Sequence, residues 1–300
     1  MKKIGIVTDS HSGITPNEAQ QLGVYVLPMP FYIEDKCYYE NETLTREDFF
    51  KKLDSGVKIS TSQPSPVSVT ELWDKALAEC EQILYIPISS GLSGSCATAF
   101  ALSSNKPYQG RVLVVDNGRV STPLYRSVLD ALEMIDEGCL SEEIQKALFD
   151  ARDRMVIYVG VQTLKHLKEG GRISSATAAL GTILNIKPVL KFDVGTLDTF
   201  QKCHVFAKAK HAMIEAMKHD LKTKFRKEYE NGEVYLLTAS SASPEETASW
   251  NAEVAAAFPD LKIMSSNLSM GVSCHIGAGG LGIGCSCRPK RPAHSHYSGS

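Results

Sequence analysis

The stretch Ser89–Ser95 (SSGLSGS) combines serine hydroxyls with glycines, directly after a run of β-forming residues. The apolar run 83–88 predicts a strand before it, and residues 96–103 predict a helix after it. Glycines let a ligand approach the backbone, and a helix N-terminus offers free N–H groups and a positive dipole end. Open α/β sheets bind ligands at the carboxyl ends of their strands. The stretch therefore indicates an anion site or, as the alternative, a plain capped turn. It lacks the lysine and the spacing of a Walker loop.

A second hydroxyl-rich loop, STSQPS over residues 60–65, leads into a predicted helix. Ser65 followed by Pro66 is typical of a helix N-cap with proline at the first helical position. Capping by Ser65 alone is one interpretation, but it leaves Thr61 and Ser62 unexplained. The other interpretation is that Thr61 or Ser62 donates a hydrogen bond to the same anion as the first loop.

A glycine-rich segment, GVSCHIGAGGLGIG, covers residues 271–284 and contains the spacing Gly-x-Gly-x-x-Gly at 277–282. We reject a dinucleotide site, because that fingerprint needs a helix after it and an acid about twenty residues further on. Only eighteen residues follow Gly282, and none of them is acidic. We expect instead a glycine-rich loop that leads into a last short strand, with His275 at its start.

A serine hydrolase is the main enzymatic alternative, with Ser93 as the nucleophile and His275 as the base. The nucleophile-elbow pattern GxSxG fails by one residue, because residues 91–95 read GLSGS. The acid that orients the histidine would be Asp9 or Asp116. Nothing in the sequence places either acid near His275.

Other catalytic and metal chemistries have less support. Asp9, directly after the first predicted strand, could accept a phosphoryl group, but no partner constellation for it is recognisable. A zinc site would use Cys274, His275, Cys285 and Cys287, whose spacing is not a standard one for zinc. We therefore expect no catalytic residue, no metal and no cofactor.

Residues 170–173, GGRI, follow two lysines and a histidine. This locally basic, glycine-broken segment could dock an acidic partner or a phosphate group through Arg172. The alternative is an ordinary solvated turn.

The predicted elements that position these residues form an α/β fold with two domains. Alternating strands and helices over residues 1–155 predict an N-terminal, mainly parallel sheet flanked by helices. A hairpin over residues 187–200 predicts a mixed or antiparallel sheet with helices in a C-terminal domain, 156–287. Residues 288–300 hold three basic residues and no acid, and we expect a disordered tail or an expression remnant.

The composition excludes several classes of protein. The 300 residues are 43% hydrophobic with a formal net charge of −2, which argues against disorder and against a nucleic-acid binder. No apolar run reaches the length of a membrane span, and the first apolar run is too short for a signal peptide. The eight dispersed cysteines predict buried free thiols in a reducing cytoplasm.

Six segments, in order, resemble the signature segments of the DegV family. They are IGIVTDS at 4–10, TSQPSP at 61–66, ISSGLSGS at 88–95, LKEGGRIS at 167–174, LNIKPVL at 184–190 and HIGAGGLGIG at 275–284. Any one of them is a weak signal. Together, at compatible spacing, they are specific, and the resemblance covers residues 1–287.

The resemblance implies a bacterial, cytoplasmic two-domain protein that binds a long-chain fatty acid in an apolar tunnel between its domains. Such a protein is the acyl-carrying subunit of a fatty-acid kinase and is not itself an enzyme. It presents the carboxylate to a separate ATP-dependent kinase subunit, and the acyl-phosphate product enters phospholipid synthesis. Its implied partners are the fatty acid, the kinase subunit and, transiently, a membrane surface, with no nucleic acid.

The resemblance also implies roles for individual residues, transferred motif by motif. The carboxylate would be held by Thr61, Ser62, Ser93 and Gly94, backed by His275, with His204 and Asn185 in the head-group network and Arg172 docking the kinase. One position departs from the family, since many members carry an arginine where this chain has His204. A stand-alone lipid-binding protein without a kinase partner therefore remains an alternative.

Overall fold

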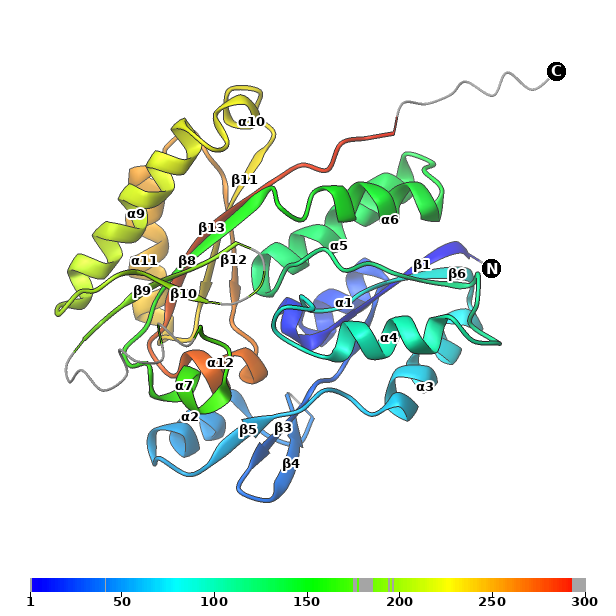
Figure 1. Ribbon diagram of the computed structural model, residues 1–300, viewed down its shortest axis with the longest axis horizontal. Coiled ribbons are helices and arrows are strands. Elements are labelled where there is room, and N and C mark those ends of the chain that lie inside the picture. The colour runs from blue at the N-terminus through cyan, green and yellow to red at the C-terminus, as the bar shows by residue number, and fades with distance from the viewer. Residues whose placement is uncertain are drawn as a thin grey trace.

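The computed structural model describes residues 2–40, 42–174, 177, 186–193, 195 and 197–292. It has an α/β architecture with two large sheets, one in each half of the molecule (Figure 1). The predicted fold class, a parallel N-terminal sheet and a mixed C-terminal sheet with helices, is confirmed. Among the described residues, no helix combines the length and the hydropathy needed to cross a bilayer.

The first sheet is parallel and has the strand order β2-β1-β6-β7. Its strands are β1 (Lys2–Asp9), β2 (Tyr25–Leu27), β6 (Cys80–Ile86) and β7 (Val112–Val114). Side chains from both faces of β1 and β6 are buried, as expected for central parallel strands that helices cover on two sides. The carboxyl ends of β1 and β6 lie side by side, which brings the loops after them together.

Helices cover both faces of this sheet. One face packs against α3 (Pro66–Leu77) and α4 (Ser95–Ser103), and the other against α1 (Pro16–Leu22), α5 (Ser121–Asp136) and α6 (Ser141–Asp150). Ser65 caps α3 by accepting from Ser68 N, and Pro66 stands at the first turn, both as predicted. A short 3-10 helix, η1 (Ser10–Ser12), follows β1 and packs against α5.

The second sheet is mixed, in the order β10-β9-β8-β13-β11-β12. Its strands are β8 (Met155–Gly160), β9 (Val189–Phe192), β10 (Asp198–Gln201), β11 (Val234–Ser240), β12 (Ile263–Asn267) and β13 (Leu281–Cys287). Among these described strands, β11 and β12 form the one parallel pair, and the other neighbouring strands pair antiparallel. Helices α9 (Phe206–Lys222) and α11 (Pro244–Ala257) cover one face of this sheet. The short helix α10 (Arg226–Glu230) lies near the upper end of α9 in Figure 1. Helix α5 packs against the other face and so lies between the two sheets.

The glycine-rich segment corrects part of the sequence prediction. Residues expected to form a loop include a helix, α12 (Met270–Ile276), with His275 in its last turn. The strand that follows, β13, lies in the middle of the second sheet and pairs with both β8 and β11. Residues 277–282 lead from a helix into a strand, the reverse of the dinucleotide fingerprint, so rejecting that site is confirmed.

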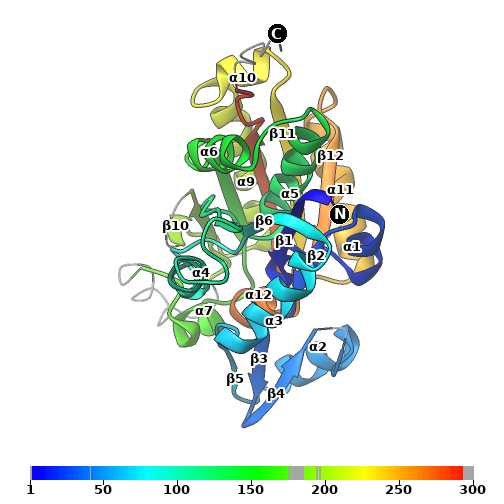
Figure 2. The ribbon, with the colours of Figure 1, turned by 90° about the vertical axis from the view of Figure 1, so that its right-hand side faces the viewer.

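A small antiparallel sheet, β4-β3-β5, projects below the two large sheets together with α2 (Arg46–Asp54) (Figures 1 and 2). Its strands are β3 (Pro30–Ile33), β4 (Lys36–Tyr39) and β5 (Ile59–Thr61). Residues 24–33 are rich in β-forming residues but do not form one continuous strand. The chain instead leaves the first sheet at Leu27, because Pro28 and Pro30 lack the N–H groups that a continuous ladder needs.

The predicted division near residue 155 falls between α6 and β8, and it remains a prediction. The expected tail over residues 288–300 also remains a prediction, and the first residues of this range contact the rest of the molecule. Arg288 donates to the carbonyl of Glu233 and to Tyr235, and Arg291 pairs with Glu133 on α5. Residues 293–300 lie outside the described residues. All eight cysteines are free, and all but Cys37 are buried, as predicted.

Candidate functional site

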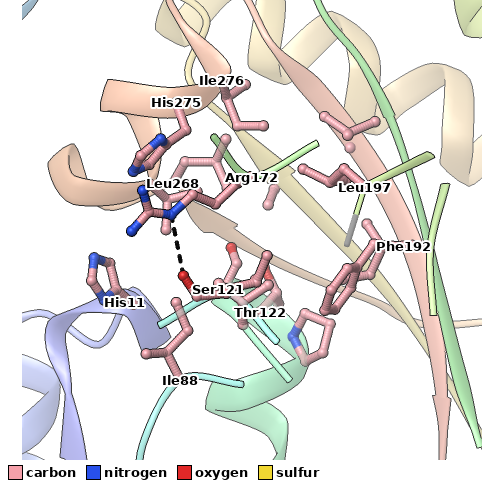
Figure 3. Close-up of a pocket in the computed structure, with 18 of the residues that line it drawn as sticks. His11, Ile88, Ser121, Thr122, Arg172, Phe192, Leu197, Leu268, His275 and Ile276 are labelled. Carbon is pink, nitrogen blue, oxygen red and sulfur yellow. Dashed lines mark hydrogen bonds between the residues drawn. The ribbon is translucent and has the colours of Figure 1, made fainter. Parts of the chain in front are cut away.

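A cavity lies between the two large sheets, and its walls come from both (Figure 3). Most of the lining is apolar and includes Ile88, Leu92, Ile157, Phe192, Leu197 and Leu268. Polar side chains gather at one end, where Figure 3 shows His11, Arg172 and His275 facing one another, away from Phe192 and Leu197. The cavity therefore combines a long apolar part with one polar end.

On the side that faces the cavity, the central strand β13 carries two glycines instead of larger side chains. Leu281, Ile283 and Cys285 belong to the core beneath α9 and α11. The alternate residues Gly282 and Gly284 both line the cavity. Because successive side chains of a strand point to opposite faces, two glycines in this register remove side chains from the cavity side only.

His275 connects the polar end to the small sheet. Its Nε2 and Thr61 Oγ1 are hydrogen-bonded at 2.8 Å, while its Nδ1 is buried without a partner. The imidazole also lies against the backbone of Gly170, where an added Cβ would stand 2.1 Å from Nδ1. Burial, and then the positive charge of Arg172, lower the pKa of His275 to about 3. The ring is therefore neutral at pH 7.

His11 is a cavity residue that the sequence analysis missed. It lies in η1, its Nδ1 has no hydrogen-bond partner, and a Cβ at Gly271 would stand 2.5 Å from its Nε2. Burial and the charge of Arg172 lower its pKa to about 4. Its place directly after a predicted strand was the one available signal, because such positions reach the ligand-binding edge of a parallel sheet.

Asp9 lies behind His11 and is fully buried. Its carboxylate accepts from the backbone N–H of Ile88 at 2.8 Å and of His11 at 3.0 Å, and it lies 3.7 Å from His11 Nδ1. Burial raises the pKa of Asp9 to about 7, against the lowering effect of these two donors. The carboxyl thus anchors the loop between β1 and η1 rather than facing the cavity.

Arg172 is the one residue with a permanent charge among the described residues that line the cavity. Its Nε donates to the carbonyl of Leu92 at 3.2 Å, and another guanidinium nitrogen donates to the carbonyl of Gly170. The sequence analysis assigned Arg172 to kinase docking. The structure places its half-buried guanidinium beside the two histidines (Figure 3), where it can also contact an anion.

The two hydroxyl loops both reach the cavity. Ser62 and Ser93 line it together with Thr61. Ser93 Oγ pairs with Ser95 Oγ at 2.7 Å and accepts from Ser95 N, while Ser62 Oγ donates to the carbonyl of Gln63. Gly94 is the N-cap of α4 and does not line the cavity.

Two predicted residues remain, His204 and Asn185. His204 is exposed and is not part of the cavity lining. Asn185 lies outside the described residues. Their place in a head-group network remains a prediction.

The hydrolase arrangement is not assembled. Ser93 pairs with Ser95, whereas His275 pairs with Thr61. A histidine with a pKa of about 3 is a weak general base at neutral pH. Neither proposed orienting acid bonds His275, since Asp9 binds backbone donors and Asp116 accepts from Ser90 and Gly118.

The cysteines considered for zinc lie in separate cores. Cys274 packs with the aromatic residues of the small sheet, whereas Cys285 and Cys287 pack beneath α9 and α11. They do not converge on His275.

Comparison with known proteins places nearly the whole chain in one family. The family model described as "Uncharacterised protein, DegV family" matches residues 3–287. A DegV domain-containing protein of Halalkalibacterium halodurans is 29% identical over 287 residues, which cover 94% of this chain and 98% of the relative.

Two solved structures share the fold at recognisable sequence identity. A DegV family protein from Thermus thermophilus, described by its fatty-acid binding, is 29% identical with a TM-score of 0.83, covering 95% of this chain and 99% of its own. DegV from Bacillus subtilis, described as a fatty acid binding protein, is 26% identical with a TM-score of 0.81, covering 96% and 100%. The fold, the ordered motifs and the family match agree, and this chain belongs to the DegV family.

Proposed function

We propose that this protein binds one long-chain fatty acid in the cavity between its two domains. The carboxylate lies at the polar end, and the acyl chain follows the apolar walls. The observation that carries the proposal is the cavity itself, which is apolar over most of its lining and ends at Thr61, Arg172 and His275. The two relatives described as fatty-acid-binding proteins support the same ligand class.

The polar end supplies the donors that a buried carboxylate needs. Desolvated carboxylates are costly unless they are hydrogen-bonded, and bonds from charged donors are the strongest. In this proposal Thr61 and Ser93 donate from their hydroxyls and Arg172 compensates the charge. Ser62 lines the cavity beside Thr61 and would join the shell if its hydroxyl turned away from the Gln63 carbonyl. Because burial keeps His275 neutral, its Nε2–H can donate to Thr61 Oγ1 and so leave the Thr61 hydrogen for the carboxylate, while neutral His11 can donate through its unpartnered Nδ1.

The apolar part supplies the driving force. Burying about fourteen methylenes at ~0.8 kcal/mol each gives roughly 11 kcal/mol of gross stabilisation. The loss of translational freedom and the ordering of the chain offset much of this. A net affinity in the micromolar to nanomolar range is compatible with a carrier that must release its ligand.

We further propose that the protein is a non-catalytic carrier that presents the carboxylate to a separate ATP-dependent kinase subunit. The family resemblance supports this role. Mixing the loaded protein with the kinase of the same organism and ATP should yield acyl-phosphate, which hydroxylamine traps as a hydroxamate. Fatty-acid binding without any acyl-phosphate would favour a stand-alone lipid-binding protein. This alternative follows from His204, which stands where many family members carry an arginine.

The first test is native mass spectrometry of the freshly purified protein, with lipid extraction from the same sample. We expect a stoichiometric mass excess that extracts as a C14–C20 fatty acid. A ligand-free mass that stays unshifted after fatty acids are added would overturn the proposal. A generic acyl-ester assay on the same sample should show no turnover, whereas turnover lost in Ser93→Ala would support the hydrolase alternative.

A further inference from the structure

The N-terminus of helix α5 opens into the cavity without a capping side chain. Val120 occupies the N-cap position and makes no cap hydrogen bond. The first backbone N–H groups of a helix have no partner within the helix and carry the positive end of its dipole. Val120, Ser121, Thr122 and Pro123 all line the cavity. This 16-residue helix therefore directs its positive end toward the cavity.

Ser121 adds a side chain with an unused hydrogen-bonding group. It is only 5% exposed, and its Oγ has no hydrogen-bond partner. The next residue differs, because Thr122 Oγ1 donates to the carbonyl of Thr238 at 2.8 Å and lies 2.6 Å from Ser266 Oγ. A buried hydroxyl without a partner is unfavourable, so its presence in a cavity wall indicates a group that the ligand completes.

The subsite lies near the head-group end of the cavity. Helix α5 packs against η1, which carries His11. Figure 3 shows Ser121 and the adjacent Thr122 in the same cavity wall, with Arg172 and Phe192 on opposite sides of them in this view. With the carboxylate at the polar end, as proposed above, the atoms of a fatty acid that pass Ser121 would be the carbons close to its carboxylate.

We propose that Ser121 and the N-terminus of α5 form a second polar subsite, which binds a hydroxyl oxygen on the acyl chain near the carboxylate. The ligand class then includes 2-hydroxy or 3-hydroxy fatty acids. A neutral hydroxyl fits better than a second anion, because Ile88, Val120 and Pro123 around Ser121 are apolar and supply no charge. A hydroxyl can accept from a helix N–H group or from Ser121 and can also donate to Ser121 Oγ.

The inference rests on the proposed fatty-acid binding and is tested with the delipidated full chain. Calorimetric titrations would compare palmitate, 2-hydroxypalmitate and 3-hydroxypalmitate. We expect at least one hydroxy acid to bind as tightly as palmitate or more tightly. Ser121→Ala should weaken that hydroxy acid about threefold to tenfold, the usual effect of one hydrogen bond, and change palmitate less than twofold.

Two further variants make the result specific. Ser121→Gly also removes the hydroxyl, and it suits the positive φ of 57° at this position, so it serves if Ser121→Ala folds poorly. Ser286→Ala is the matched control, because Ser286 is a fully buried serine without a partner that does not line the cavity. It should alter the affinity of no ligand.

The outcomes separate this inference from the proposed function. If palmitate binds but both hydroxy acids bind more than fivefold more weakly, the subsite is overturned and the fatty-acid site stands. The subsite is also overturned if both Ser121 variants lower the affinities for palmitate and for the hydroxy acids equally. If no acid binds, the proposed function fails, and the subsite fails with it.

Discussion

Thr61 Oγ1 lies 2.8 Å from His275 Nε2, and this bond joins strand β5 to helix α12 across 214 residues of sequence. Both residues line the cavity, so the bond fixes one hydroxyl and one imidazole at its polar end. Because the pKa of His275 is lowered to about 3, the bond joins two neutral groups at pH 7 and leaves the charge of Arg172 available for an anion.

Replacing Thr61 with valine keeps the shape of the side chain and removes its hydroxyl. It leaves a second nitrogen of His275 buried without a partner, which costs about 1–3 kcal/mol of unfolding free energy. The affinity for a C16 fatty acid should also fall about threefold to tenfold, as measured by calorimetric titration. The control is Thr70→Val, where the hydroxyl donates to carbonyls of its own helix and does not line the cavity. Equal effects of the two variants would contradict a role for Thr61 in the site.

Ser93→Ala should weaken fatty-acid retention. The substitution removes a cavity hydroxyl that is otherwise held by Ser95. We expect a threefold to tenfold faster loss of fatty acid to acceptor vesicles. Ser103→Ala is the control, since that hydroxyl donates to the carbonyl of Phe100 within α4. Unchanged release by Ser93→Ala would count against its assignment to the carboxylate.

Gly282 and Gly284 form a natural pair for testing where the acyl chain lies. A Cβ at Gly282 would lie 3.5 Å from its nearest neighbour, an ordinary contact, whereas a Cβ at Gly284 would lie 2.9 Å from the carbonyl oxygen of Val156. Gly282→Ala should therefore fold normally and reduce affinity for C18 acids more than for C14 acids. Gly284→Ala should lose about 1–3 kcal/mol of stability in urea denaturation. A chain-length profile unaltered by Gly282→Ala would place the acyl chain elsewhere.

Arg172→Gln distinguishes the head-group role from kinase docking. Removing the positive charge should raise the pKa of His275, because that charge is the second cause of its lowering after burial. NMR titration of the imidazole measures this shift, and fatty-acid affinity should fall in parallel. Lys168→Gln, on the exposed side of α7 (Lys165–Gly170), is the control. A loss of kinase turnover with unchanged affinity would assign Arg172 to docking alone.

Asp9 should make stability depend on pH. Its pKa is raised from 3.8 to about 7, so the folded state holds the proton more tightly than the unfolded chain. The resulting stabilisation is complete below about pH 4 and is lost as the pH rises through 7. Relative to Asp9→Asn, the unfolding free energy of the wild type should fall by about 3 kcal/mol between pH 5 and pH 8.

The two histidines respond in the opposite direction, because their lowered pKa values favour the folded state above pH 6.5 and lose that effect as the pH falls. His11 and His275 are present in both the wild type and the Asp9→Asn variant. So is Glu40, whose pKa burial also raises to about 7. The comparison therefore isolates Asp9. A difference in stability that does not vary with pH would show that Asp9 is ionised throughout.

The sequence by itself determined the local elements and the family. Apolar periodicity and the Ser65–Pro66 cap predicted α3, and β-rich runs predicted the strands of the first sheet, because these signals act between near neighbours in the chain. The hydroxyl loops were recognisable for the same reason, since a ligand-binding loop after a parallel strand is a local pattern.

Only the tertiary structure decided which residues share the cavity. His11 and Arg172 meet His275 because η1 and the end of α7 both pack against α12, and no spacing in the chain encodes that contact. The central place of β13 likewise depends on its pairing with β8 and β11. Local propensity selects helix or strand, whereas burial of apolar faces over long separations selects neighbours, and the polar end of this cavity exists only through the second effect.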